Sequence, residues 1–233
     1  EAGDVLPTVR LYRWKRPTVS LGRFQKLDDV DLETCLVEGI DVCRRPTGGR
    51  GVLHDDEVTY SIVAGVRDGL PRGVSASYRM LCGALVEAYR ELGVPAELTG
   101  RPRGDRGSGA CYLHATDADL SLGAAKLSGS AQVWSATSCL QHGSFVLTRD
   151  STVEARVFRL GEQGASDLDR TTGTIEEALG HRPQEPELSQ RLLAGLARGL
   201  DAEFDLQVLT EGEIDAAQRS IDDFGVVAGM HER

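Results

Sequence analysis

Cys111 and Lys126, fifteen positions apart, are the residues of this sequence best suited to nucleophilic chemistry. A cysteine attacks as the thiolate, and a nearby ammonium lowers the pKa of a thiol from about 8.5. Gly123 and the two alanines before Lys126 allow the chain to turn back, so that the two side chains can meet. An inert, half-buried cysteine is the alternative, and the spacing alone does not exclude it. The pair therefore predicts a reactive thiol beside its activating cation, provided that the chain turns.

Small residues follow Lys126 and lead to a His-Gly pair. Small side chains allow a ligand to approach the backbone closely, so we expect this stretch to bind substrate. The residues concerned are Gly129, Ser130, Ala131, His142 and Gly143. A structural histidine is the alternative for His142.

A second glycine-rich segment, RRPTGGRGVLHDDEVTYS, runs from Arg44 to Ser61. It predicts a backbone cradle for an acyl or phosphate-bearing ligand, with a guanidinium beside it, on the opposite side of the same pocket. The alternatives are a β-turn with a solvated arginine and a histidine that only holds the loop. The candidate binding residues of this segment are Arg45, Gly48, Gly49, Arg50 and His54.

Cys139 is the rival nucleophile, because His142 follows it three residues later and a Cys-His pair is a known nucleophile and base. On an extended strand, however, these positions face opposite sides. Cys35, Cys43 and Cys82 lie in apolar surroundings and are interpreted as packing residues. An odd number of cysteines with no CxxC and no metal-ligand spacing indicates a reduced, cytoplasmic protein without a bound metal.

The composition predicts one large domain or one domain with a small appendage. The chain has 233 residues, 40% of them hydrophobic, and a formal net charge of −10. No basic face is evident for nucleic acid, and no apolar segment is long enough for a membrane helix. We expect a core acyl-binding region over residues 1–150, and a helical part of the same domain or a small subdomain over 151–233. A monomer is the default expectation.

Hydrophobic periodicity predicts an α+β fold with mixed sheets. Alternating and β-branched stretches predict strands over Val9–Trp14, Thr18–Leu21, Asp41–Arg45, Val58–Ala64, Leu120–Leu122, Lys126–Ser135, Cys139–Leu147 and Phe204–Leu209. Apolar residues at three- and four-residue steps predict helices over Asp31–Glu38, Tyr78–Leu92, Thr174–Leu179, Leu188–Leu200 and Glu213–Phe224. Ser75 or Ser77 is expected to cap the long helix, and Gly93 to close it.

Three motifs, RRPTGGRGVLHDDEVTYS, KLSGSAQ and LQHGS, closely resemble the lipoate–protein ligase and octanoyltransferase superfamily. The opening LYRWKRPTVSLGRFQ fits the same pattern. The resemblance implies a catalytic domain like that of the biotin and lipoate ligases. It also implies that Gly48, Gly49, Gly129, Ser130 and Ala131 line an acyl tunnel.

Within that superfamily, Cys111 and Lys126 resemble the cysteine-dependent octanoyltransferases, which carry an acyl-thioester cysteine fifteen residues before the motif lysine. The sequence Gly48-Gly49-Arg50 also resembles the octanoyltransferases, which tend to have arginine where the ligases have a third glycine. The resemblance implies octanoyl transfer from octanoyl-acyl carrier protein to a lysine of a lipoyl domain or of glycine-cleavage protein H, with neither ATP nor metal. The alternatives are an ATP- and magnesium-dependent lipoate ligase, an amidotransferase between lipoyl domains, and a non-catalytic acyl- or lipoyl-domain-binding module.

Two features depart from the superfamily pattern. The sequence starts after the usual N-terminal helix with its Asn-Met-Ala-x-Asp pattern. The segment between Cys111 and Lys126 is rich in alanine rather than in proline and aromatic residues, which leaves the acyl chain length open.

Overall fold

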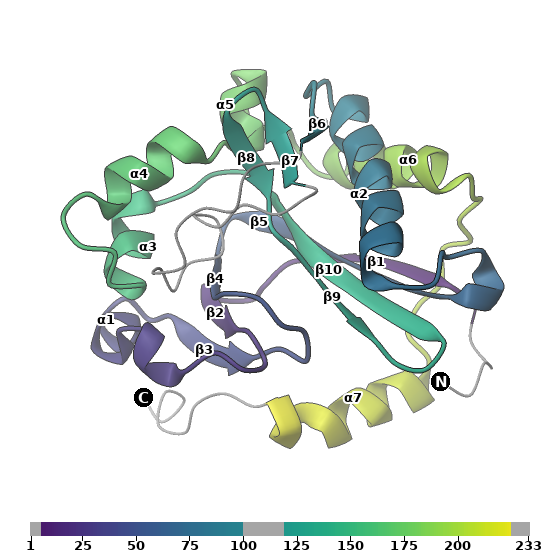
Figure 1. The fold of residues 1–233 in the computed structure, drawn as a ribbon, viewed down its shortest axis with the longest axis horizontal. Helices are drawn as coiled ribbons and strands as arrows, with labels where there is room; N and C mark the ends of the chain where they lie inside the picture. The colour runs from purple at the N-terminus through teal and green to yellow at the C-terminus, as the bar shows by residue number, and fades with distance from the viewer. Residues whose placement is uncertain (1–5, 100–118, 225–233) are drawn as a thin grey trace.

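The computed structural model describes residues 6–99 and 119–224. The described residues form three sheets with helices packed around them, which confirms the predicted α+β class. Helices lie on two opposite sides of the molecule (Figure 1). They are α2 (Val74–Glu91) and α6 (Glu187–Leu200) on the first side, and α1 (Leu32–Val37), α3 (Ser151–Val157) and α4 (Gly164–Thr171) on the second.

The largest sheet is antiparallel and contains four strands. Their order is β1 (Thr8–Tyr12), β5 (Glu57–Gly65), β10 (Ser138–Val146) and β9 (Ser130–Trp134). The sequence VTYSIVA in β5 is rich in β-branched residues, which suit a pleated, buried surface. The prediction of a central strand there is confirmed.

A second sheet carries the glycine-rich loop. Its strands are β3 (Asp41–Arg44), β2 (Thr18–Leu21) and β4 (Val52–His54), with β2 in the middle. Since β3 and β4 flank β2, the loop that joins them crosses the end of β2. Sequence analysis did not predict β4, because three residues are too short to show a period.

The third sheet contains β6 (Glu97–Thr99), β7 (Asp119–Leu122) and β8 (Ala125–Ser128). The predicted single strand Lys126–Ser135 is wrong, because Gly129 interrupts it and the chain passes from this sheet into β9 of the first. A glycine without a side chain to pack allows such a change of sheet. The predicted strand β7 is confirmed, and β6 was missed.

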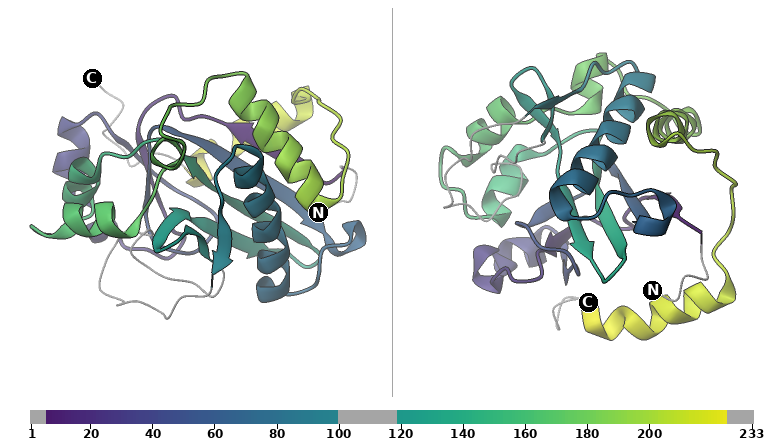
Figure 2. Two further views of the ribbon diagram at one scale, coloured as in Figure 1. Left: turned by 90° about the horizontal axis from the view of Figure 1, so that it is seen from above. Right: turned by 45° about the vertical axis from the view of Figure 1, so that its right-hand side comes forward.

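Helices α2 and α6 lie side by side and cover one part of the core (Figures 1 and 2). The predicted leucine stripe is confirmed, since Leu188, Leu192 and Leu196 are fully buried. They share one core with the buried residues of α2 and β5, so α6 and the first 150 residues enclose the same apolar interior. Gly195 and Gly199 lie against the α2 backbone, where a Cβ would overlap it.

The predicted cap of α2 is wrong. The helix begins one turn earlier, at an N-cap Gly73 without a side-chain bond, and Ser77 lies inside the first turn. Its hydroxyl donates to the carbonyl oxygen of Gly73 (2.8 Å) instead of accepting from a free N–H. Gly93 closes the helix at φ 94°, as expected.

Several of the shorter helices have side-chain caps at their N-termini. Asp31 accepts from Thr34 N at the start of α1. Thr174 and Glu177 form a capping box at α5 (Ile175–Leu179). Helices α3 and α4 lie in the part of the chain after residue 150, which was predicted to be helical.

The C-terminal part includes one further correction. Residues 202–210 are irregular rather than a strand over Phe204–Leu209, and Val208 is 90% exposed. A strand needs a neighbouring edge for its backbone groups, and this stretch has none among the described residues. Thr210 and Glu213 form the predicted capping box of α7 (Glu211–Phe224), which lies apart from the other helices (Figures 1 and 2).

The described part of the chain contains no helix with both the length and the apolar character that a bilayer crossing requires.

Candidate functional site

The glycine-rich loop between β3 and β4 is organised by Arg45, which is 7% exposed. Its Nη1 donates to the carbonyl oxygen of Ser20 (2.6 Å), and its Nη2 donates to those of Gly48 (2.9 Å) and Arg50 (2.7 Å). Its Nε donates to Thr47 Oγ1 (3.1 Å). A buried guanidinium is costly unless its donors are bonded, so these contacts fix the path of the loop. Direct binding of substrate by Arg45 stays a prediction.

The tip of this loop is formed by glycines. Gly48 is half-buried with open space where a Cβ would lie, and Gly49 is exposed at φ 92°. Gly22, directly after β2, approaches so closely that a Cβ there would overlap the carbonyl group of Gly49. Sequence analysis did not select Gly22, although a glycine directly after the strand sequence TVSL could have indicated a close backbone approach. Arg50 Nη1 lies 3.9 Å from Asp29 Oδ2.

His142 of β10 joins the loop to the large sheet. Its Nε2 lies 2.7 Å from Thr47 Oγ1, while Ala131 is its neighbour across the β9–β10 register. Burial, followed by the nearby charges of Arg45 and His54, lowers the pKa of His142 to about 4. The imidazole is therefore neutral near pH 7 and acts through hydrogen bonding. This contact brings the two predicted segments together.

Gly143 marks a second close approach. A Cβ at this position would overlap the carbonyl oxygen of Gly129, and would lie 2.9 Å from Tyr60 Cε1 and 3.0 Å from Ser130 Oγ. The Tyr60 hydroxyl donates to Ser130 Oγ (2.7 Å). The small-residue run and the His-Gly pair thus form one continuous surface, and its acyl-lining role stays a prediction.

A Gly143→Ala variant is expected to lower the free energy of unfolding by about 1–3 kcal/mol, because its methyl group forces the Gly129 backbone away. Chemical denaturation measures this. Gly83→Ala is the matched control, because Gly83 lies inside α2 with open space around it. We expect that control to gain about 0.5–1 kcal/mol. Equal stability of Gly143→Ala and the parent protein would contradict the close approach.

Lys126 lies on β8 and is 3% exposed. Its carbonyl oxygen accepts from Gly173 N (2.9 Å), and three residues later the chain reaches Gly129. The predicted nucleophile Cys111 lies outside the described residues. The proximity of Cys111 to Lys126 therefore stays a prediction.

The described cysteines are free thiols that burial makes poor nucleophiles. Burial raises the pKa of Cys35, Cys43 and Cys139 to about 11. Cys139 and Cys82 lie in the main core, whereas His142 bonds to the loop. A reactive cysteine requires a lowered pKa, so the structure disfavours Cys139 as the rival nucleophile.

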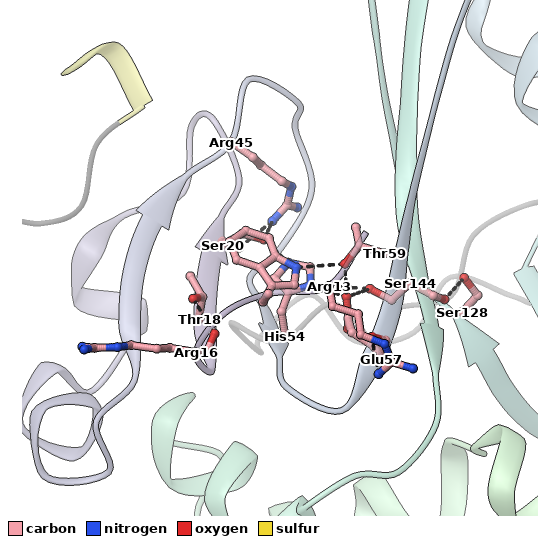
Figure 3. Close-up of polar contacts among 11 residues, drawn as sticks. Arg13, Arg16, Thr18, Ser20, Arg45, His54, Glu57, Thr59, Ser128 and Ser144 are labelled. Carbon is pink, nitrogen blue, oxygen red and sulfur yellow. Dashed lines mark hydrogen bonds and ion pairs between the residues drawn. The ribbon is translucent and has the colours of Figure 1, made fainter. Parts of the chain in front are cut away.

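His54 is part of a buried polar network that sequence analysis did not anticipate (Figure 3). Its Nε2 lies 2.7 Å from Ser20 Oγ, and its Nδ1 lies 2.8 Å from Glu57 Oε1. Trp14 stacks on the imidazole at a centroid distance of 4.5 Å, and its Nε1 donates to Thr59 Oγ1 (2.8 Å). His54 is 5% exposed, so the structure gives it a structural role; ligand contact stays a prediction. The sequence HDDE, in which Glu57 follows His54 by three residues, could have indicated the contact between these two side chains.

Glu57 is the acceptor at the centre of this network. Burial opposes its ionisation, but His54 and the hydroxyl groups of Thr59 and Ser144 outweigh that effect and hold the pKa of Glu57 below its usual value. The Thr59 and Ser144 hydroxyls lie 2.5 and 2.8 Å from Glu57 Oε1. A buried carboxylate with three donors is a fixed anion between the two sheets.

A cavity of about 140 Å³ lies between the second sheet and α3, with Glu57 on its wall. Asp55, Asp150 and Glu154 are among the residues that line it. None of the described residues predicted to bind substrate lines this cavity, so it does not mark the expected acyl site.

Comparison with known proteins relates this arrangement to one family. Residues 1–197 match the lipoyl protein ligase A/B catalytic domain. Octanoyltransferase LipM of Moorella thermoacetica is 38% identical over 224 residues, which cover 91% of this chain and 81% of that protein. Octanoyltransferase LipM of Symbiobacterium thermophilum is 37% identical, with 94% and 84% covered.

Solved structures share the fold. A lipoate-protein ligase A bound with ATP has a TM-score of 0.77 at 22% identity, covering 94% of this chain and 83% of that one. A bipartite lipoate protein ligase from Thermoplasma acidophilum has a TM-score of 0.73 at 23% identity, covering 94% and 81%. With the family match over most of its length, this chain belongs to the lipoyl protein ligase A/B catalytic domain family.

Proposed function

We propose that this protein is an octanoyltransferase of lipoate biosynthesis. It takes the octanoyl group from octanoyl-acyl carrier protein and delivers it to a lysine of a lipoyl domain or of glycine-cleavage protein H. The observation that carries the proposal is the set of relatives named octanoyltransferase, 32–38% identical over most of the chain. The Cys111–Lys126 spacing supports the same conclusion.

The reaction proceeds in two acyl transfers. The Cys111 thiolate attacks the carbonyl carbon of the donor thioester, a new C–S bond forms, the C–S bond to the carrier breaks, and the carrier leaves as a thiolate that takes a proton from solvent. The acceptor lysine then attacks the octanoyl-enzyme as a free amine, an amide bond forms, and the Cys111 thiolate is released as the amine loses a proton. The donor is already an activated thioester, so the sequence of steps requires neither ATP nor a metal ion.

The described residues suggest how the substrate is held. Lys126 carries the positive charge that favours the thiolate and the developing oxyanion. Gly48 and Gly49 present backbone at the loop tip, and Gly129 to Ala131 present only small side chains. His142 is neutral, so it fixes the loop through Thr47 without adding charge beside an apolar chain.

Mass spectrometry tests the proposal. We expect incubation with octanoyl-acyl carrier protein, without ATP, to add the mass of one octanoyl group to the peptide that contains Cys111. Addition of a lipoyl domain should then move that mass to the acceptor lysine. Modification that requires free octanoate, ATP and magnesium would instead indicate a ligase. Transfer only from an octanoylated lipoyl domain would indicate an amidotransferase.

A further inference from the structure

A chain of polar contacts connects the buried carboxylate of Glu57 to the glycine-rich loop. Glu57 Oε1 lies 2.8 Å from His54 Nδ1, His54 Nε2 lies 2.7 Å from Ser20 Oγ, and Ser20 Oγ lies 3.3 Å from Arg45 Nη1. All four side chains are at most 7% exposed. The members come from β5, β4, β2 and the residue after β3, so the chain spans both sheets (Figure 3).

The roles at the two ends of this chain are fixed by chemistry. Arg45 can only donate, so Ser20 Oγ accepts from it. The lowered pKa of Glu57 keeps it an acceptor, so His54 donates from Nδ1. The Ser20 hydroxyl, 2.7 Å from His54 Nε2, joins the imidazole to the guanidinium. The chain thus begins at a cation and ends at an anion, and successive hydrogen bonds of this kind reinforce one another in a buried setting.

Arg45 transmits this arrangement to the loop. Its Nη2 holds the carbonyl oxygens of Gly48 and Arg50, at 2.9 and 2.7 Å. Its Nη1 also holds the carbonyl oxygen of Ser20 (2.6 Å). The orientation of the guanidinium therefore decides where the loop backbone lies.

A catalytic triad is the other interpretation of Ser20, His54 and Glu57, because their order is that of a nucleophile, a base and an acid. The surroundings do not suit it. Ser20 is 2% exposed in the middle strand of its sheet, and its hydroxyl already contacts Arg45. A nucleophile has to reach its substrate. Ser20 is therefore a link between His54 and Arg45 and not a nucleophile.

We propose that Glu57, His54 and Ser20 are positioning residues that hold the Arg45 guanidinium, and through it the glycine-rich loop, in the conformation that binds the acyl chain. The acyl role of the loop rests on the proposed function. The mechanical link from Glu57 to the loop does not, and it can be measured without any substrate.

Four variants test the link. Ser20→Ala removes the hydroxyl that joins His54 to Arg45, and Glu57→Gln removes the anion at the end of the chain. The double variant Ser20→Ala/Glu57→Gln tests whether the two act along one path. Ser77→Ala is the matched control, because Ser77 is also fully buried, and its hydroxyl donates to backbone at the start of α2 and to Gln132 rather than to any member of this chain.

Hydrogen exchange is the substrate-free readout. We expect faster amide exchange over residues 47–51 in Ser20→Ala and Glu57→Gln, with the β5 amides as protected as in the parent protein. The double variant should exchange little faster than the faster single variant, and Ser77→Ala should match the parent over residues 47–51. Unchanged exchange in both single variants, additive effects, or an equal effect of Ser77→Ala would each overturn the proposal.

Steady-state kinetics give the second readout. We expect Ser20→Ala to raise the KM for octanoyl-acyl carrier protein about three- to tenfold, as loss of one hydrogen bond would, with kcat little changed. Loss of kcat in Ser20→Ala would make Ser20 a catalytic residue and overturn the positioning role. If the parent protein transfers no octanoyl group, the proposed function fails, while the exchange experiment still decides the link.

Discussion

A Cys111→Ser variant is expected to lose octanoyl transfer by roughly 10⁴-fold or more, as enzymes do when their nucleophile is removed. Serine presents a neutral hydroxyl where the reaction needs a thiolate, and the ammonium of Lys126 cannot ionise an alcohol near pH 7. The rate of transfer to a lipoyl domain, followed by mass spectrometry, measures the loss. Transfer at the parental rate would exclude Cys111 as the nucleophile.

Cys139→Ala is the matched control for that experiment. Cys139 is 1% exposed in the main core, and burial raises the pKa of its thiol to about 11. We expect this variant to keep the parental transfer rate and to lose only packing. A loss of activity equal to that of Cys111→Ser would make Cys139 a candidate nucleophile again.

A Lys126→Met variant is expected to lower kcat/KM by about 10²–10⁴-fold, the usual contribution of a positioned group that manages charge and protons. Methionine keeps much of the buried length of this side chain, which is 3% exposed, but removes its charge. Without the ammonium, the pKa of Cys111 should rise towards about 8.5. The pH dependence of alkylation at Cys111 measures that rise.

Thermal denaturation and the alkylation profile together separate loss of the Lys126 charge from loss of the fold. Thermal denaturation should show a variant that unfolds cooperatively, so that a lost fold is not mistaken for lost chemistry. The thiol of the parent protein should react at lower pH than that of the variant, because a lower pKa gives more thiolate. Identical alkylation profiles would show that Lys126 does not activate Cys111.

Most helices and strands of the fold were predicted from the local pattern of apolar residues. The β-branched run of β5 and the leucine stripe of α6 predicted their elements, because burial of one face imposes a period on the sequence. Short strands such as β4 and β6 show no period and were missed. The apolar residues of Phe204–Leu209 predicted a strand that finds no partner edge in the part of the chain that the structure describes, so local propensity was overridden there.

The candidate site divides in a similar way. Glycines predicted the loop tip, since a tight turn and a close backbone approach require them, while the acyl-lining role of the small residues stays a prediction. The contacts of Arg45 and His54 with Ser20, Glu57 and distant carbonyl groups could not be predicted, because no local pattern connects these residues. Sequence analysis selected both residues as ligand contacts, with a histidine that holds the loop as the alternative for His54; the structure shows both holding other parts of the chain, and ligand contact by either stays a prediction.

The sequence by itself determined the chemistry that is present: Cys111 fifteen residues before Lys126, two glycine-rich segments, and motifs similar to one superfamily. Only the tertiary structure decided which groups meet. Thr47 and His142 are 95 residues apart in the chain and 2.7 Å apart in space. Such a contact depends on how sheets and helices pack over the whole core, and residue types at fixed spacing carry no information about that packing.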